Sequence, residues 1–502
     1  MMTSPGTQSS GSLPALLLAP EPATPLESAG SAEPLLDRLA RRLELSGIQY
    51  CQWKGHWSAH RWATGHGDVD LLVDREAITE FRTIIGQLGF KAAYPAGHRR
   101  IPGVESYYGH DPLVPRLLHL HVHYRLILGD YWRPIYRLPI ERPMLERSVP
   151  GQPFRAPSPT YQFLVFVLRL MLRQVGRPLL SAQTRWTSGV EIQLASLEAG
   201  SDREELAGIL AHHLPTVDLA LFDRCVRSLQ GGCGALERAV LPWQLHQRLR
   251  SHARRPHAVA VLAAVLERIL PASVAQTISP DQMHLAAGGA VIALLGGDGS
   301  GKTTCARELA RWLAPVFLTM RAHLGNPPRS LLTLLIGGLL KLQHGLERLL
   351  KHTAGEAKYL ELLRYVCMAR DRFRLYRRIH RFAARGGVAI CERYPVEQNR
   401  FLVGPCIPGL LRGKPDRLQA WLQLKEASYY HRMLGPDALC VLRLHPDLAV
   451  TRKPEEPEDY VRARGRVIWE TDWTGTGAHL VDASQPLADV VLRLKSILWS
   501  TL

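Results

Sequence analysis

The sequence predicts an α/β protein with a doubly wound parallel sheet in its C-terminal domain, an α+β domain in its N-terminal half, and a helical region between them. Three observations predict this class. Residues 290–314 have the pattern of a buried strand, a glycine-rich turn and an amphipathic helix. Short apolar strands then alternate with helices to the end of the chain. Asp68 and Asp70 alternate with apolar residues in an N-terminal segment that has strand spacing.

The length and the composition divide the chain further. At about 100–200 residues per domain, 502 residues predict two to four domains. The first 32 residues are rich in Pro, Ser, Gly and Ala and are expected to be disordered. The expected units are a tail at 1–32, an α+β domain at 33–156, a helical region at 157–275 and an α/β domain at 288–502.

The charge favours anionic partners. The formal net charge is +17, so nucleotides, phosphorylated small molecules and nucleic acid are all candidate binding partners. The eight cysteines are scattered without a C-x-x-C pair, which argues against a disulfide framework and a structural zinc site. The N-terminus shows no leader pattern, and the apolar run at 331–340 is too short to span a bilayer. We therefore expect a cytoplasmic protein without a membrane span.

The N-terminal domain has a candidate metal site on one strand. Residues two apart on a strand point to the same side, so Asp68 and Asp70 would present two carboxylates together. Such a pair can bind Mg²⁺ and through it a triphosphate. Helices are expected at 35–45, before this strand, and at 77–88, after it.

These residues carry a resemblance. Lys54-Gly55, the run G-D-V-D-L-L-V from Gly67 and the following helix resemble the nucleotidyltransferase fold, and most closely a bacterial branch that carries K-G where others carry G-S. In that branch a third carboxylate stands where this chain has His121, and histidine is a poorer ligand for Mg²⁺. The resemblance implies either an active nucleotidyltransferase or a degenerate domain used in binding or regulation. A third reading is a transition-metal site formed by the alternating histidines 119, 121 and 123.

The middle of the chain is predicted to be mainly helical and shows no pattern typical of a site. Apolar residues recur at helical spacing within 159–175, 204–229 and 259–269. Residues 271–280 have the composition of a linker before the next domain.

The glycine-rich turn predicts phosphate binding. Residues 296–303 match G-x-x-x-x-G-K-[ST] at every fixed position. Glycines let successive N–H groups converge, and the following helix directs its positive end to the same place. Lys302 would reach the β- and γ-phosphates of ATP, and the Thr303 hydroxyl would bind Mg²⁺. The nucleotide-binding residues are expected to be Gly296, Asp298, Gly299, Ser300, Gly301, Lys302, Thr303 and Thr304.

The rest of this domain is expected to complete a parallel sheet covered by helices on both faces. Ligands of such sheets bind at the carboxyl ends of the strands, where the turn and Glu392-Arg393 both fall. The expected helices are 331–350, 358–384 and 487–498, and the expected strands are 388–392, 438–444 and 480–483.

Residues 288–502 resemble the thymidylate kinase-like branch of the P-loop NTPase kinases. Three features carry the resemblance: the turn G-G-D-G-S-G-K-T-T, the triplet Glu392-Arg393-Tyr394 at a strand end, and the run from Pro446 to Glu455 before an arginine-bearing segment. The resemblance implies ATP and Mg²⁺ as cofactors. It implies catalytic roles for Lys302, Arg393 and Arg452, and acceptor binding by Glu392, Arg393 and Arg372, with Glu392 near the acceptor or Mg²⁺. It also implies that Arg452, Arg462 and Arg464 are lid cations.

The expected activity is transfer of the γ-phosphate of ATP to a nucleoside monophosphate of the thymidylate type or to a related phosphorylated acceptor. The alternatives are a bifunctional nucleotidyltransferase and kinase, and a regulatory protein that binds nucleotide without catalysis. For the last, arginines crowd residues 370–381 and could contact nucleic acid, where counterion release would dominate binding. The identity of the acceptor stays open.

Overall fold

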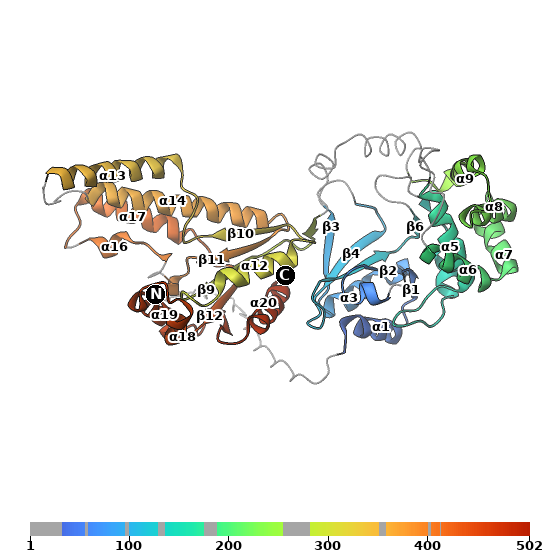
Figure 1. The fold of residues 1–502 in the computed structure, drawn as a ribbon, viewed down its shortest axis with the longest axis horizontal. Helices are drawn as coiled ribbons and strands as arrows, with labels where there is room; N and C mark the ends of the chain where they lie inside the picture. Colours follow the sequence, from blue (N-terminus) through green and yellow to red (C-terminus); the bar gives the residue numbers. More distant parts are fainter. Residues whose placement is uncertain are drawn as a thin grey trace, which may run out of the picture.

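The computed structural model describes residues 33–55, 59–95, 100–128, 136–174, 188–254, 282–350, 358–399, 403–411 and 413–502. The expected tail at 1–32 and the expected linker at 271–280 lie outside the described residues. Figure 1 shows two sheets side by side, with one group of helices at each end of the molecule. No helix in the described ranges is both long and apolar enough to cross a bilayer.

Six strands of the described chain form the N-terminal sheet: β1 (Tyr50–Lys54), β2 (Asp68–Val73), β5 (Leu118–His123), β4 (Val104–Gly109), β3 (Lys91–Pro95) and β8 (Met283–Leu285), in this spatial order. β2 and β5 are parallel, and the other neighbours are antiparallel. The expected strand with two aspartates is therefore present and lies between β1 and β5.

One face of this sheet is apolar and the other carries the polar site. Helices α1 (Leu35–Ser46) and α3 (Ile78–Gln87) cover the apolar face, where they pack on Val69 and Leu71 of β2. α1 buries one leucine-rich stripe and ends at Gly47, whose φ of 71° suits a glycine. Because side chains alternate along β2, its two aspartates point to the opposite face. Two short helical segments, α2 (Ala59–Trp62) and η2 (Arg75–Ala77), flank β2.

A helical group packs against the β1 end of this sheet. Helix α5 (Pro159–Leu172) is apolar on nearly all sides and is buried among the other helices. The helical content expected for the middle of the chain is confirmed where that part is described. The remaining elements are β6 (Ile127–Leu128), β7 (Tyr136–Arg137), α4 (Glu141–Glu146), α6 (Ser188–Ala199), α7 (Arg203–His213), α8 (Leu219–Leu229), α9 (Ala235–Arg248) and η4 (Arg250–His252).

The C-terminal sheet is wholly parallel. Among the described residues its strands are β10 (Thr319–His323), β11 (Val388–Glu392), β9 (Val291–Gly296), β12 (Ala438–Arg443) and β13 (His479–Asp482), in this spatial order. After β9 the chain adds β10 and β11 on one side of this strand, and it then adds β12 and β13 on the other side. The turn after β9 therefore lies at a switch point, where parallel sheets bind ligands.

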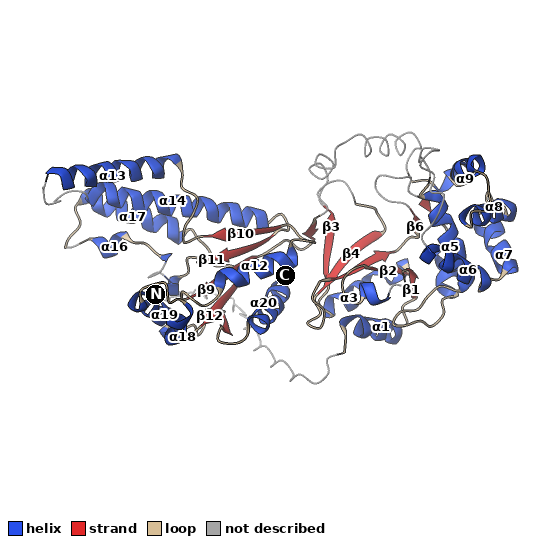
Figure 2. Ribbon diagram, in the orientation of Figure 1, coloured by secondary structure: helices blue, strands red, loops and turns tan. Residues whose placement is uncertain are grey.

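Helices cover both faces of this sheet, as a doubly wound arrangement requires (Figure 2). Helices α12 (Lys302–Leu313) and α20 (Leu487–Thr501) pack on one face, and α14 (Lys358–Ala383) packs on the other. The α/β class expected from the sequence is confirmed. The further helices are α13 (Leu331–Leu350), η5 (Glu397–Asn399), α16 (Ile407–Leu410), α17 (Arg417–His431), α18 (Pro446–Arg452) and α19 (Glu458–Glu470).

The two sheets are joined by contacts that the sequence pattern did not predict. β8 precedes the expected C-terminal domain yet pairs with β3, placing Leu285 beside Ala93. The Trp499 indole donates a hydrogen bond to the Gly89 carbonyl at 2.9 Å. Trp312 and Trp499 share one core with Ala93. The helix that follows the glycine-rich turn therefore packs directly against the N-terminal domain.

Candidate functional site

The glycine-rich turn joins the end of β9 directly to the start of α12. β9 ends at Gly296, and α12 begins at Lys302 after Gly301, whose left-handed φ is 83°. A Cβ on Gly297 would lie 3.0 Å from Gly465, and one on Gly299 would lie 3.0 Å from the Ala449 carbonyl. Side chains at these positions would therefore fill the space where the loop meets α18 and α19. The amino end of α12, including Thr303 and Thr304, faces this loop.

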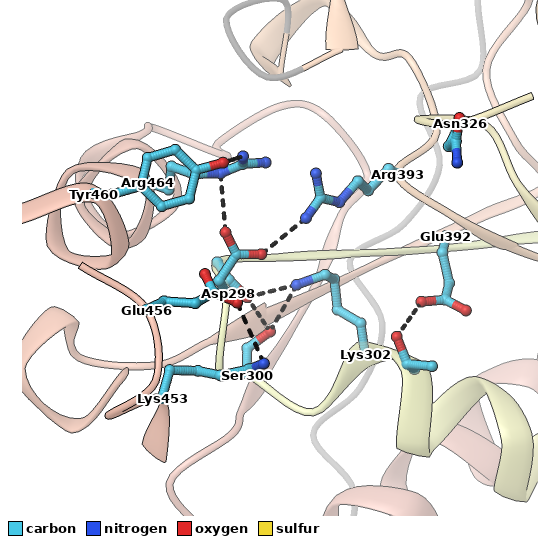
Figure 3. A network of polar contacts seen from close by, with 12 residues as sticks. Asp298, Ser300, Lys302, Asn326, Glu392, Arg393, Lys453, Glu456, Tyr460 and Arg464 are labelled. Atoms are coloured by element: carbon cyan, nitrogen blue, oxygen red, sulfur yellow. Dashed lines mark hydrogen bonds and ion pairs between the residues drawn. The ribbon is translucent and has the colours of Figure 1, made fainter. Parts of the chain in front are cut away.

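The Lys302 amine is held inside the loop. Lys302 is 8% exposed, and its Nζ donates a hydrogen bond to the Gly297 carbonyl at 2.5 Å. Ser300 Oγ is 3.4 Å from the same Nζ. Burial lowers the pKa of Lys302 to about 8, against the opposing effect of the Asp298 carboxylate. Figure 3 shows the amine directed at the loop, where ATP phosphates are expected.

Glu392 connects the end of β11 to the first turn of α12. Its side chain is buried, and its Oε2 accepts a hydrogen bond from Thr303 Oγ1 at 2.6 Å. Arg321 of β10 approaches the other carboxylate oxygen at 3.5 Å. A hydroxyl and a carboxylate are hard oxygen ligands of the kind that Mg²⁺ prefers. Thr303, which was expected to bind Mg²⁺, and Glu392, which was expected near the acceptor or Mg²⁺, therefore lie together.

Arg393 extends into the same space from a strained backbone. Its φ of 53° is the one positive value among the described residues other than glycine. A left-handed backbone costs such a residue about 1–2 kcal/mol, and strain of this kind gathers at functional sites. Its Nη2 lies 2.8 Å from Asp298 Oδ1. A Cβ on Gly325 would lie 2.8 Å from the Cδ of Arg393, so the glycine leaves room for the arginine.

Arg464 of α19 completes the network from the opposite side (Figure 3). Its Nε lies 3.0 Å from the second oxygen of Asp298, and its guanidinium also contacts the Tyr460 hydroxyl. Asp298 thus pairs with two arginines, one directly after β11 and one from the expected lid. Arg462 instead pairs with Asp447 and Glu458.

Two expected site arginines bind the backbone instead. Arg452 is exposed and donates to the Ala483 carbonyl at 2.9 Å, so it does not join the Asp298 network. Arg372 is buried and donates to the carbonyls of Leu324 at 2.7 Å and Gly325 at 3.4 Å. Its third contact is the Tyr430 hydroxyl. Arg372 therefore fixes the turn after β10 that carries Gly325 beside Arg393.

The arginine-rich helix α14 has both buried and exposed charged residues. The Asp371 carboxylate is buried and accepts hydrogen bonds from the Ser330 backbone and from Thr333, at the start of α13. Four arginines further along the helix are exposed: Arg374, Arg377, Arg378 and Arg381. This part of α14 presents a basic surface away from the loop.

In the N-terminal sheet, each aspartate pairs with its own histidine. Parallel pairing places Asp68 beside His119 and Asp70 beside His121. His119 Nδ1 lies 2.6 Å from Asp68 Oδ1, and His121 Nδ1 lies 3.0 Å from Asp70 Oδ1. Lys54 of β1 lies 2.8 Å from Asp70. The two carboxylates are therefore engaged separately, which differs from the shared Mg²⁺ site that their spacing suggested.

The environments of these aspartates also differ. Asp70 is buried, whereas the Asp68 side chain is 53% exposed. Burial opposes ionisation of Asp68, but the hydrogen bond and charge of His119 outweigh it and lower its pKa to about 2. Asp68 and His119 line a cavity of about 810 Å³ whose other wall includes Trp312 of α12 and Lys495 of α20. This cavity therefore lies between the two sheets.

Three side-chain contacts of these sites were not predicted from the sequence. Arg321 was overlooked because the strand that carries it was not predicted. The pairing of Arg464 with Asp298 joins residues that are 166 positions apart, and the pairing of Lys54 with Asp70 depends on the strand order. The K-G motif was the one signal that pointed to Lys54. No family model matches this chain, and no curated protein matches it significantly.

Proposed function

We propose that the protein is an ATP- and Mg²⁺-dependent phosphotransferase of the thymidylate kinase-like kind, acting in the cytoplasm. It would transfer the γ-phosphate of ATP to a nucleoside monophosphate or a related phosphorylated acceptor. One observation carries the proposal. Lys302, the Thr303–Glu392 pair and the Arg393–Asp298–Arg464 network converge at the carboxyl edge of one parallel sheet.

The loop supplies the binding site for ATP. Its N–H groups and the positive end of α12 would hold the phosphates, with Lys302 as the mobile cation. Thr303 and Glu392 are the residues that would hold Mg²⁺, because both present oxygen atoms beside the loop. The bound ion would neutralise phosphate charge. Phosphoryl transfer needs positioning and charge neutralisation, and these residues provide both kinds of group.

Arg393 and Arg464 are the groups proposed to act on the acceptor and on the phosphoryl group in flight. Both guanidinium groups now pair with the Asp298 carboxylate. A phosphate can present two oxygens to a guanidinium group, as a carboxylate does, and it carries more negative charge. Substrate phosphates would therefore compete with Asp298 for these arginines. The resemblance gave lid roles to Arg452, Arg462 and Arg464, and the contact with Asp298 supports this role for Arg464. Arg372 supports the site by positioning the Gly325 turn.

The N-terminal domain is proposed to be accessory in this reaction. The separate engagement of Asp68 and Asp70 by histidines favours this role over a second, nucleotidyl-transferring site. The test uses ATP labelled separately at the α- and γ-phosphates, with Mg²⁺, across nucleoside monophosphates and sugar phosphates. γ-Label transfer supports the kinase, whereas α-label transfer would favour the bifunctional alternative.

A further inference from the structure

Three side chains that can bind a metal ion lie close together on the polar face of the N-terminal sheet, outside the proposed kinase site. Asp70 of β2 is flanked by His121 and His123 of β5. One ligand atom from each residue lies within 4.8 Å of the other two, and no other group of this kind is found in the described ranges. Asp68 and His119, two residues earlier on the same strands, are outside this group.

The distances suit a single small cation. His121 Nδ1 lies 3.0 Å from Asp70 Oδ1 and 3.3 Å from His123 Nε2, and the third separation is 3.9 Å. A tetrahedral ion with bonds of about 2.1 Å has ligand atoms about 3.4 Å apart. We propose that Asp70, His121 and His123 bind a divalent first-row transition cation of the zinc type.

The ligand set selects this class of ion over Mg²⁺. Two imidazoles and one carboxylate suit zinc and its neighbours, whereas Mg²⁺ is bound by oxygen ligands. Three protein ligands leave a coordination position open, as in catalytic rather than structural sites. His121 also lines a cavity of about 580 Å³ together with Ser106 and Arg100, so water or a small anionic ligand can reach it.

The site is held rigidly before any ion binds. Asp70 and His121 are paired in register on adjacent strands, and His123 is 3% exposed. The rings of Trp53 and His123 pack in a T-shaped arrangement with centroids 4.9 Å apart. Such packing fixes the ring orientation, which metal affinity depends on.

Lys54 occupies a position from which it would compete with the bound ion. Its ammonium group lies 2.8 Å from the same Asp70 oxygen that would bind the ion. The cation of Lys54 and the metal ion would therefore compete for one carboxylate. Removing Lys54 should raise metal affinity, whereas removing a ligand should lower it.

The experiment measures Zn²⁺ binding to the full chain by calorimetry after chelator treatment and dialysis, with millimolar Mg²⁺ present throughout. The expected result is one Zn²⁺ per chain that Mg²⁺ does not displace. His121→Ala and Asp70→Asn should each weaken binding by more than about 100-fold, because each removes a ligand. Co²⁺ substitution should give the visible absorption of a site with imidazole ligands, and His121→Ala should remove it.

His119→Ala is the matched control, since it removes a histidine from the same strand but outside the group. It should leave Zn²⁺ affinity within about 3-fold of the unsubstituted protein. Lys54→Met should strengthen binding about 10-fold, a gain that a folding defect cannot produce. Failure of the unsubstituted protein to bind Zn²⁺ at micromolar concentrations would overturn the proposal. So would equal losses in His119→Ala and His121→Ala.

Discussion

Thr303 and Glu392 lie 89 positions apart in the sequence, yet the Thr303 hydroxyl donates a 2.6 Å hydrogen bond to the Glu392 carboxylate. The first residue lies at the start of α12, directly after the glycine-rich turn, and the second lies at the end of the neighbouring strand β11. This contact links the two motifs on which the proposed kinase site depends. It also places two oxygen ligands beside the loop where Mg²⁺ would bind.

Substitution of Glu392 should impair catalysis through the metal. Glu392→Gln keeps the shape but removes the charge, and we expect kcat to fall about 100-fold. The concentration of Mg²⁺ needed for half-maximal rate should rise as well. Steady-state kinetics across a Mg²⁺ titration measures both. A fall in kcat with an unchanged Mg²⁺ dependence would place Glu392 at the acceptor instead.

Lys302 should make the ligand-free protein less stable near neutral pH. Its pKa falls from 10.5 to about 8, so the unfolded chain binds the proton more tightly between these values. Stability therefore rises with pH across this interval, by ~3 kcal/mol at ~1.4 kcal/mol per pKa unit. Lys302→Met loses one hydrogen bond, worth about 1 kcal/mol.

At pH 7 Lys302→Met should therefore be more stable than the unsubstituted protein by about 2 kcal/mol. The difference should vanish near pH 10 and reverse by about pH 11, where only the lost hydrogen bond remains and the unsubstituted protein should be the more stable by about 1 kcal/mol. Denaturant unfolding at several pH values measures this, and a pH-independent difference would contradict the burial of a charged amine.

We expect substitutions of the two lid arginines Arg464 and Arg452 to have different effects on kcat. Arg464 contacts Asp298 inside the network, so Arg464→Ala should lower kcat about 100-fold. Arg452 donates to the Ala483 carbonyl, so Arg452→Ala should lower kcat by no more than about 3-fold. Parallel measurement of kcat for both variants decides between them. Equal losses would return a catalytic role to Arg452, as the family resemblance implies.

Arg372 should act by holding the Gly325 turn. Arg372→Ala leaves the carbonyls of Leu324 and Gly325 without their donor, which should cost about 1–3 kcal/mol of stability. We also expect a higher KM for the acceptor with a smaller change in the KM for ATP. Tyr430→Phe, which removes one contact of Arg372, should show the same pattern more weakly. A stability loss with both KM values unchanged would leave Arg372 without a functional role.

The local motifs predicted much of this architecture. The turn at 296–303 was predicted because its residues are contiguous and its backbone chemistry is specific. The strand at 388–392 was predicted from its apolar run between a glycine pair and a charged triplet. β10 and β8 were missed, since each is short and is stabilised by neighbours distant in the sequence. Asp298 was predicted as one of the nucleotide-binding residues, but its pairing with Arg393 and Arg464 depends on how β11 and α19 pack around the loop.

The proposed kinase activity is tested most directly by measuring γ-phosphate transfer from labelled ATP. The measurement compares the unsubstituted protein with Lys302→Ala and Arg307→Ala. Arg307 is exposed on the same helix as Lys302, so it controls for the loss of one positive charge. We expect transfer to a phosphorylated acceptor by the unsubstituted protein and by Arg307→Ala, and none by a folded Lys302→Ala. Undiminished transfer by Lys302→Ala would contradict the proposal.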